Sequence, residues 1–411
     1  MKGSLEVFIV IPTYWTWRRD QLGEASGALF DHPTPVDGKS TLPRLLRSLC
    51  QVKEPPFSVL VLTATVHPDL EQAAAERVNG LIAPFRESFP IAQFSAEELK
   101  LVRKRAQELG QWDLLPFLSL RSYPGVRNCQ LIIPHILGAE VIVALDDDEV
   151  IEPDYLPKAL EFIGQEYRGK RVWGLGGLYL DKEGNPFLPE HPPTGNIFLD
   201  KNIFMNQAIK RLLEKPGRLA RTYIAFGGNM VLHRNLFTRV PFDPAITRGE
   251  DIDYVINAHL AGFDFWFDKE LTITHLPPEP YGALPYTKLL QDVYRFIYER
   301  EKLRLAAERD DVNPLPLEAL NPYPGRFLQD DLTDQALEAL RSKATPEMVS
   351  SYGPPEAIIT AARRHTDRMA PCYFGLARVW PCLMEILGQD ASLRQRLLAR
   401  FGFPSVSLGK L

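Results

Sequence analysis

Four consecutive carboxylates follow a short apolar run near the middle of the chain, in the segment Val141–Glu149, VIVALDDDE. The apolar, mostly β-branched run predicts a strand buried on both faces, as in a parallel sheet. The acids then lie at its C-terminal end, where open α/β sheets bind ligands. Alternate strand residues share a face, so Asp146 and Asp148 are predicted to bind a divalent cation, Mg²⁺ or Mn²⁺, that carries phosphate oxygens. The alternative is a solvated acidic turn.

Other elements must position this segment. Apolar runs at Glu6–Ile11 and Phe57–Leu62 predict two more buried strands, of which the first is stopped by Pro12. Leu118–Ser122 is a candidate third strand. A helix over Gly125–Leu137 is predicted to feed the strand that ends in the acids. This alternation predicts an α/β fold with a mostly parallel sheet flanked by helices.

The chain is long enough for two regions. We predict a catalytic α/β domain over residues 1–282, with an insertion at about 66–122, because that interval is long for one crossover. Residues 283–411 are predicted to form a mainly helical C-terminal region, which includes an amphipathic helix over Tyr286–Ala307.

Composition excludes several classes of protein. The 411 residues are 45% hydrophobic with a net charge of −5, which does not indicate nucleic-acid binding. The four cysteines are widely spaced and form no zinc motif. The sequence contains no signal-peptide pattern and no transmembrane segment. We therefore expect a cytoplasmic protein, and leave peripheral membrane association and homodimer formation open.

Several motifs occur in a fixed order along residues 5–278. VIPTY spans Val10–Tyr14, GVRN begins at Gly125, and the acid cluster follows. FGGN begins at Phe226, GED begins at Gly249, and ITHLPP ends the series at Pro278. This order resembles the GT-A glycosyltransferases, which have a nucleotide-diphospho-sugar transferase-like fold, and is most similar to glycosyltransferase family 2. The resemblance implies a hexosyltransferase that uses a nucleoside diphosphate sugar donor and a hydroxyl-bearing acceptor.

The resemblance also implies roles for the acids. Asp146 and Asp148 correspond to the D-x-D pair that holds the metal on the diphosphate, and Asp147 is expected to point toward the ribose or the sheet edge. Asp251 corresponds to the general base of inverting members, with Glu250 orienting it or the acceptor. The alternative is that Glu250 and Asp251 have no catalytic role and are acids at a helix N-terminus, where the helix dipole favours negative charge.

Further residues are implied as ligands of the metal or the donor. His275 matches a late histidine that serves as a metal or phosphate ligand. Family 2 enzymes usually carry an acid after the second strand, and here Thr63 and neighbouring threonines stand there instead, so the base of the donor stays open. The expected donor-binding residues are Pro12, Thr13, Tyr14, Thr63, Arg127, Asn128, Asp146, Asp147, Gly227, Gly228 and Asn229.

Two other classes of protein fit parts of the pattern. Asp146-Asp147-Asp148-Glu149-Val150 also matches the D-x-D-x-[TV] motif of haloacid-dehalogenase-like phosphatases, in which the first Asp is a nucleophile and the second a general acid. That family usually begins near this strand, whereas 140 residues precede it here. A non-catalytic nucleotide-sugar-binding module is the third reading, and the acids at both key positions argue against it.

Overall fold

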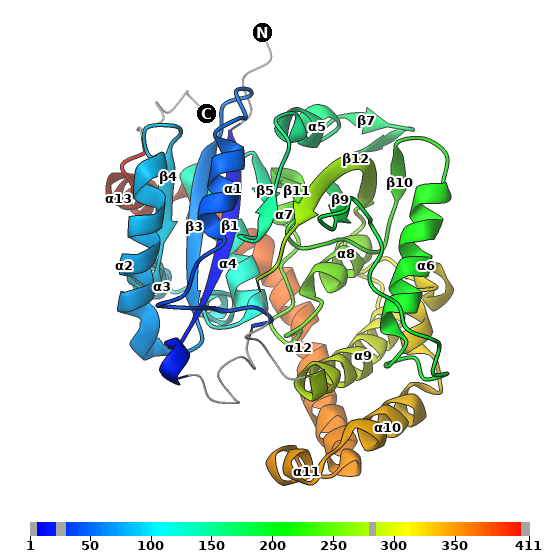
Figure 1. The fold of residues 1–411 in the computed structure, drawn as a ribbon. Coiled ribbons are helices and arrows are strands. Elements are labelled where there is room, and N and C mark those ends of the chain that lie inside the picture. Colours follow the sequence, from blue (N-terminus) through cyan, green and yellow to red (C-terminus); the bar gives the residue numbers. More distant parts are fainter. Residues whose placement is uncertain (1–5, 22–29, 279–284, 404–411) are drawn as a thin grey trace.

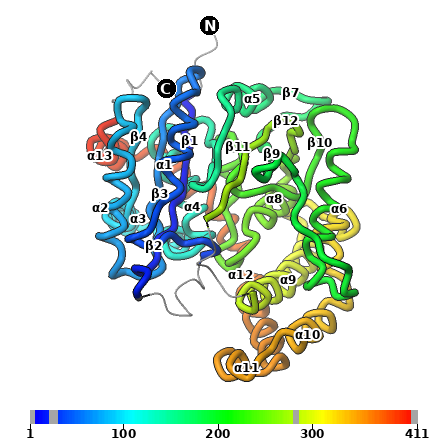
Figure 2. The backbone as a smooth tube through the Cα atoms, in the orientation of Figure 1, coloured from blue at the N-terminus to red at the C-terminus, as the bar shows by residue number. Residues whose placement is uncertain are grey.

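A computed structural model describes residues 6–21, 30–278 and 285–403. Its centre is a ten-stranded mixed sheet whose main path has the order β10-β12-β9-β11-β5-β1-β3-β4 (Figures 1 and 2). The strands that run in one direction are β1 (Val7–Thr16), β2 (Thr34–Pro35), β3 (Ser58–Thr65), β4 (Ile91–Phe94), β5 (Val141–Ala144), β9 (Gly174–Leu180) and β12 (Trp266–His275). The opposite strands are β6 (Glu149–Val150), β10 (Leu219–Arg221) and β11 (Met230–His233). A separate small hairpin pairs β7 (Glu166–Tyr167) with β8 (Lys170–Arg171).

Helices cover both faces of this sheet. Successive residues of the central strands point to opposite faces and are apolar on both, so each face must be buried. On β1, Val7, Ile9 and Ile11 pack with α1 (Leu42–Leu49), α2 (Glu71–Ile82) and α5 (Tyr155–Glu161). Phe8 and Val10 face a second core. That core is built with α3 (Ala96–Glu108), α4 (Tyr123–Leu137), α7 (Arg234–Phe237), α8 (Glu250–Leu260), α12 (Pro355–Gln389) and α13 (Ala391–Phe401).

The C-terminal region is helical and packs against the sheet domain through a third core. It comprises α9 (Pro285–Ala307), α10 (Leu332–Lys343), α11 (Pro346–Tyr352), α12 and α13, and its core is shared with α6 (Lys201–Glu214) and α8. Figure 1 shows α9, α10 and α11 together beside the sheet, while α12 runs back along it. The predicted α/β fold with a helical C-terminal region is confirmed. The predicted boundary at residue 282 lies outside the described residues.

Two local predictions were wrong. β1 continues through Pro12 to Thr16. Proline is tolerated there because β5 pairs with β1 only as far as Val10 and β2 pairs with it only from Trp15, so Pro12 has a strand partner on one side alone. Leu118–Ser122 forms no strand. The Leu118 carbonyl accepts a hydrogen bond from the Arg103 guanidinium (2.6 Å), and the third parallel strand beside β3 is instead β4, within the predicted insertion.

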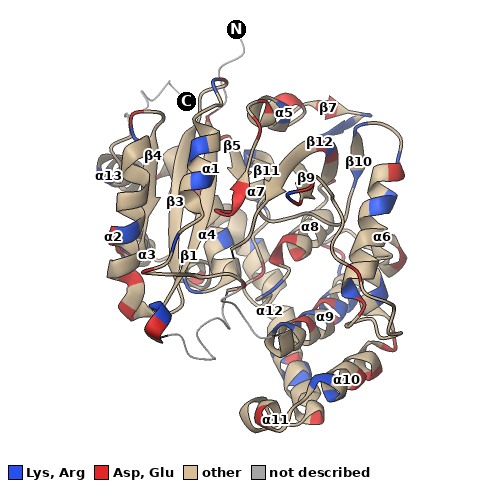
Figure 3. Ribbon diagram, viewed as in Figure 1, with Lys and Arg blue, Asp and Glu red and all other residues tan. Residues whose placement is uncertain are grey.

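Charged side chains of both signs are interspersed over the helices in the view of Figure 3. Among the described helices, none is long and apolar enough to span a membrane.

A buried histidine joins the C-terminal region to the sheet domain. His135 of α4 lies 2.7 Å from the carbonyl oxygen of Met384 in α12. Burial lowers the pKa of His135 to about 4, although the hydrogen bond to Met384 partly opposes this. The unfolded chain therefore binds more protons between about pH 6.5 and 4, so the free energy of unfolding falls as the pH drops through this window.

We expect this histidine to make folding acid-sensitive. Urea denaturation at pH 7 and pH 4 should show that wild type loses about 3 kcal/mol more stability than His135→Gln, which does not titrate there. The difference between the two losses of stability removes the contributions of all other titrating groups, because both proteins contain them. Equal losses would show that protonation of His135 is not linked to unfolding.

Candidate active site

A cavity of about 390 Å³ opens at the C-terminal ends of β1 and β5. Its wall combines the start of α4, the acidic segment after β5, the start of α8 and the end of β12, all of which the sequence motifs singled out. Of the predicted residues, those that line it are Tyr14, Arg127, Asp146, Asp147, Asp148, Gly227, Glu250, Asp251 and His275.

The acidic segment places one carboxylate against the late histidine. Asp148 Oδ2 lies 3.2 Å from His275 Nε2, because β12 pairs with β6 and thereby sets His275 beside Glu149. Burial alone would raise the pKa of Asp148 and lower that of His275, but the contact between them reverses both shifts. A carboxylate and an imidazole side by side in a cavity are suitable ligands for a divalent cation.

The other two aspartates of the acidic segment have protein partners. Arg127 Nη1 lies 3.1 Å from Asp146 Oδ1. Asp147 is hydrogen-bonded to Thr41, and burial together with the charges of Asp148 and Asp146 raises its pKa well above the usual range. Within the described residues, no three His, Cys, Asp or Glu side chains form a ready-made metal cluster. The protein therefore offers Asp148 and His275 as an adjacent pair, with Asp146 in the same cavity wall.

Arg127 connects the acidic segment to the start of α8. The arginine is 4% exposed, and its Nε lies 3.2 Å from Glu250 Oε1. Burial and the charge of Asp251 together raise the pKa of Glu250 to about 7, although Arg127 opposes both. Arg127 was predicted to bind the donor, and in this structure its guanidinium is paired with the carboxylates of Asp146 and Glu250.

Asp251 is held by backbone donors at the N-terminus of α8. Its Oδ2 accepts a hydrogen bond from the Gly227 N–H (3.0 Å), and its Oδ1 accepts one from the Ile252 N–H (2.8 Å). Each carboxylate oxygen keeps a second lone pair for another donor. Gly249, the residue immediately before α8, has φ +69°, and a Cβ there would lie 1.8 Å from Nη1 of Arg295 in α9. Glycine is therefore required where α9 packs under the start of α8.

The paired glycines make room for protein side chains. A Cβ on Gly227 would lie 2.4 Å from Arg127 Nη2, and a Cβ on Gly228 would lie 2.0 Å from Glu149 Oε1. The sequence pattern had predicted that these glycines admit the donor sugar or the acceptor. Their immediate neighbours within the protein are Arg127 and Glu149, which order the acidic segment, since Glu149 Oε2 accepts a hydrogen bond from the Asp146 N–H (2.9 Å).

Gly228→Ala should therefore destabilise the protein by about 1–3 kcal/mol, because Glu149 must move to admit the methyl group. The matched control is Gly80→Ala in α2, where a Cβ meets nothing within 4 Å. That change should be neutral or stabilise by up to about 1 kcal/mol. Thermal denaturation of both variants measures the contrast, and equal effects would contradict the packing argument.

The remaining predicted residues do not line the cavity, and the side chains of most of them are hydrogen-bonded within the protein. Thr13 Oγ1 donates to the Leu62 carbonyl, and Thr63 accepts from Gln93. Asn128 pairs with both backbone groups of Phe242. The Asn229 amide donates to two carbonyls and accepts from Tyr155. Pro12 and Gly228 also lie outside the lining.

The cavity also contains residues that the sequence analysis missed. Tyr179 of β9 accepts a hydrogen bond from the Gly228 N–H (2.7 Å). The others come from loops, α6 and the C-terminal region, where no motif marks them. They include Asp31, His32, Lys201, Arg248, Arg295 and Tyr323.

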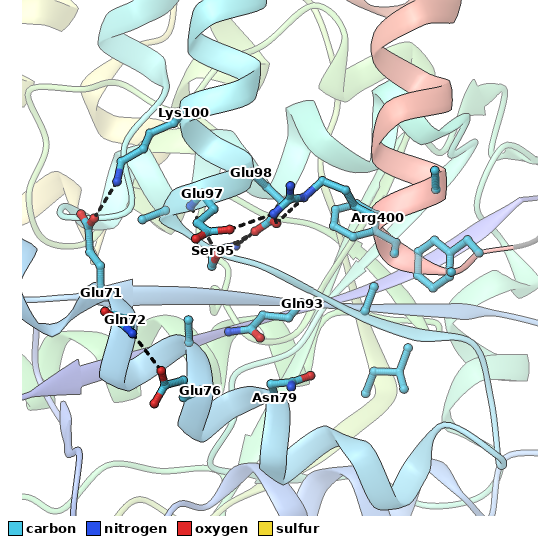
Figure 4. A pocket seen from close by; sticks show the side chains of 18 of the residues that line it. Glu71, Gln72, Glu76, Asn79, Gln93, Ser95, Glu97, Glu98, Lys100 and Arg400 are labelled. Atoms are coloured by element: carbon cyan, nitrogen blue, oxygen red, sulfur yellow. Dashed lines mark hydrogen bonds and ion pairs between the residues drawn. The ribbon is translucent and has the colours of Figure 1, made fainter.

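A larger hollow of about 1230 Å³ lies along the edge strand β4, between α2, α3 and α13 (Figure 4). Its charged side chains pair with one another. Arg400 contacts Glu98 (2.8 Å), and Lys100 contacts Glu71 (3.7 Å). None of the predicted site residues lines this hollow. The smaller cavity is therefore the candidate active site.

Comparison with solved structures finds the chain similar to glycosyltransferases. One is the mannosyltransferase PcManGT from Pyrobaculum calidifontis in complex with GDP-Man and Mn²⁺ (12% identity, 93% of this chain and 88% of that chain, TM-score 0.43). A second is S. aureus TarS 1–349 in complex with UDP (13%, 97% and 92%, TM-score 0.41). A third is GalNAc-T7 with UDP, GalNAc and Mn²⁺ (12%, 86% and 59%, TM-score 0.40).

No protein-family model and no curated protein matches the chain. The identities to solved structures are low and these TM-scores lie below 0.5. What the chain does must therefore be argued from its own residues.

Proposed function

We propose that the chain is a metal-dependent glycosyltransferase that moves a hexose from a nucleoside diphosphate sugar to a hydroxyl acceptor, with inversion at the anomeric carbon. One observation carries this proposal. A single cavity at the C-terminal ends of the parallel strands contains both the Asp148–His275 pair and the backbone-held carboxylate of Asp251. The ordered sequence motifs that resemble family 2 point to the same residues.

The donor set fits a divalent cation, Mg²⁺ or Mn²⁺. Such ions are commonly bound by one or two carboxylates together with substrate phosphates and water, so a complete protein cluster is not required. Asp148 and His275 would hold the ion, with Asp146 beside them. When bound, the ion would offset negative charge on the departing nucleoside diphosphate. Tyr14 lines the same cavity and is partly buried near the end of β1, beside the expected donor.

Asp251 is the general base in this proposal. The acceptor hydroxyl donates its proton to Asp251 as its oxygen attacks the anomeric carbon, and the bond from that carbon to the diphosphate breaks. The Gly227 and Ile252 N–H groups fix the carboxylate. Glu250 is bound to Arg127, so it serves to position this end of α8 rather than to accept the proton.

The geometry disfavours the phosphatase alternative. A haloacid-dehalogenase-like mechanism needs Asp146 as a free nucleophile. In this cavity the Asp146 carboxylate is paired with the buried Arg127 guanidinium.

The test is an activity screen with UDP-, GDP- and ADP-hexoses, each with Mn²⁺ or Mg²⁺ and a mixed panel of hydroxyl acceptors. The expected result is release of one nucleoside diphosphate together with a glycosylated product seen by mass spectrometry. NMR of the new anomeric centre should show inversion. Phosphate release from a generic phosphomonoester, without sugar transfer, would instead support the phosphatase.

A further inference from the structure

Three cationic side chains line the candidate active site on the side formed by α6 and α9. Lys201 begins α6, Arg248 precedes the GED motif, and Arg295 lies in α9. Lys201 Nζ contacts Asp292 Oδ2 at 2.6 Å. Arg248 Nη1 contacts Asp31 at 2.6 Å, and its Nε lies 3.4 Å from Asp292. We call Lys201, Arg248 and Arg295 the cationic wall.

The cationic wall and the neighbouring Lys288 together carry more positive charge than their carboxylate partners neutralise. Asp292, Asp31 and Glu299 pair with the three cations of the wall, and Lys288 adds a fourth cation 3.7 Å from Asp31. Burial lowers the pKa of Lys201, Asp292 opposes that shift, and the charges of Arg248 and Arg295 lower it further. Cations that are crowded in this way are stabilised when an anion joins them.

One guanidinium nitrogen of the wall also lacks a hydrogen-bond acceptor. Arg295 is 4% exposed and donates to Glu299 and Tyr323, yet its Nη2 has no partner. Burial raises the pKa of Glu299, the carboxylate paired with Arg295, to about 7. Glu299 is therefore only partly ionised near neutral pH. Buried donors without acceptors are costly, and they indicate a place where a ligand oxygen belongs.

From this arrangement we propose that the acceptor carries an anionic group, a phosphate or a carboxylate, which binds Lys201 and Arg248 with Arg295 behind them. The proposal rests on the proposed function and names the class of its acceptor substrate. Planar guanidinium groups and a lysine form charge-assisted hydrogen bonds with either anion. The anion would anchor the acceptor while a hydroxyl of the same molecule reaches Asp251, which lines the same cavity.

The test is calorimetric titration of inorganic phosphate, glycerate and glycerol into protein saturated with Mg²⁺ and its preferred nucleoside diphosphate. Saturation with the nucleotide removes the diphosphate site as a second place for phosphate to bind. We expect phosphate or glycerate to bind and glycerol to bind much more weakly. Which of the two anions binds more tightly distinguishes a phosphate-bearing from a carboxylate-bearing acceptor.

Variants locate the anion. Lys201→Met should weaken binding by at least about tenfold, Arg248→Gln should act in the same direction, and Lys201→Arg should retain most of the affinity. Lys210→Met, an exposed lysine on the same helix, is the control and should bind as wild type does. Nucleotide affinity should be unchanged in all four proteins.

Absence of phosphate and glycerate binding, or equal binding by Lys201→Met, would overturn the proposal. Loss of nucleotide affinity in Lys201→Met would also overturn it, because the wall would then belong to the donor. Absence of nucleotide binding by wild type would overturn the proposed function, and with it the assignment of this wall to an acceptor.

Discussion

Replacement of Asp251 by Asn is expected to lower the rate of sugar transfer by about 10²- to 10⁴-fold, the range for loss of a general base. The amide keeps the size of the side chain and can still accept a hydrogen bond from the Gly227 N–H through its oxygen. It cannot accept the proton of the acceptor hydroxyl. Donor affinity should therefore stay within a factor of a few, because Asp251 makes no contact with the Asp148–His275 pair among its hydrogen bonds.

The measurement is kcat for transfer together with donor affinity for wild type and Asp251→Asn. The matched control is Asp154→Asn at the start of α5, an acid at a helix N-terminus whose side chain is 60% exposed. The control should transfer sugar at the wild-type rate. Wild-type kcat in Asp251→Asn would exclude Asp251 as the base and shift attention to Glu250.

The largest expected loss of stability comes from Lys302→Met in α9. Lys302 is fully buried, and its ammonium group contacts Asp243 (3.0 Å), Asp253 and Asn257 (3.0 Å). Asp253 and Asn257 belong to α8, whose first residues are Glu250 and Asp251. Removal of the cation strands two buried carboxylates, which typically costs about 3–5 kcal/mol.

Chemical denaturation measures this loss. Arg304→Met on the same helix removes a cation that is 56% exposed and paired with Glu301 and Glu308, and it should change stability by less than about 1 kcal/mol. Addition of Asp253→Asn to Lys302→Met should recover part of the loss by removing one stranded charge. A Lys302→Met protein as stable as the Arg304→Met protein would contradict the buried-pair account.

Signals confined to one element predicted most of the fold. The apolar run before Asp146 predicted β5, and the 3.6-residue periodicity of 286–307 predicted α9, since both patterns depend only on near neighbours. Position relative to other strands was harder to predict. The strand β4 has only four residues, which is too short for the periodicity of apolar residues to distinguish a strand from a helix. Its extended conformation depends on pairing with β3.

The candidate site divides in the same way. Asp148, His275 and Asp251 could be selected from motifs because each lies at the end of a strand or the start of a helix within a recognisable run. The roles of Asn128 and Asn229 could not be predicted, because only the fold reveals that their amides are saturated by backbone groups and Tyr155. The cationic wall could not be predicted from the sequence for a related reason, since its three residues come from separate segments that only the fold brings together.

The most direct test of the central claim is calorimetric titration of UDP and GDP into wild type and Asp148→Ala, each with and without Mn²⁺. We expect that wild type binds one nucleoside diphosphate, that Mn²⁺ tightens binding by at least about tenfold, and that Asp148→Ala loses this enhancement. Binding that is the same with and without Mn²⁺, or an unchanged enhancement in Asp148→Ala, would show that this cavity does not hold a metal–diphosphate complex through Asp148.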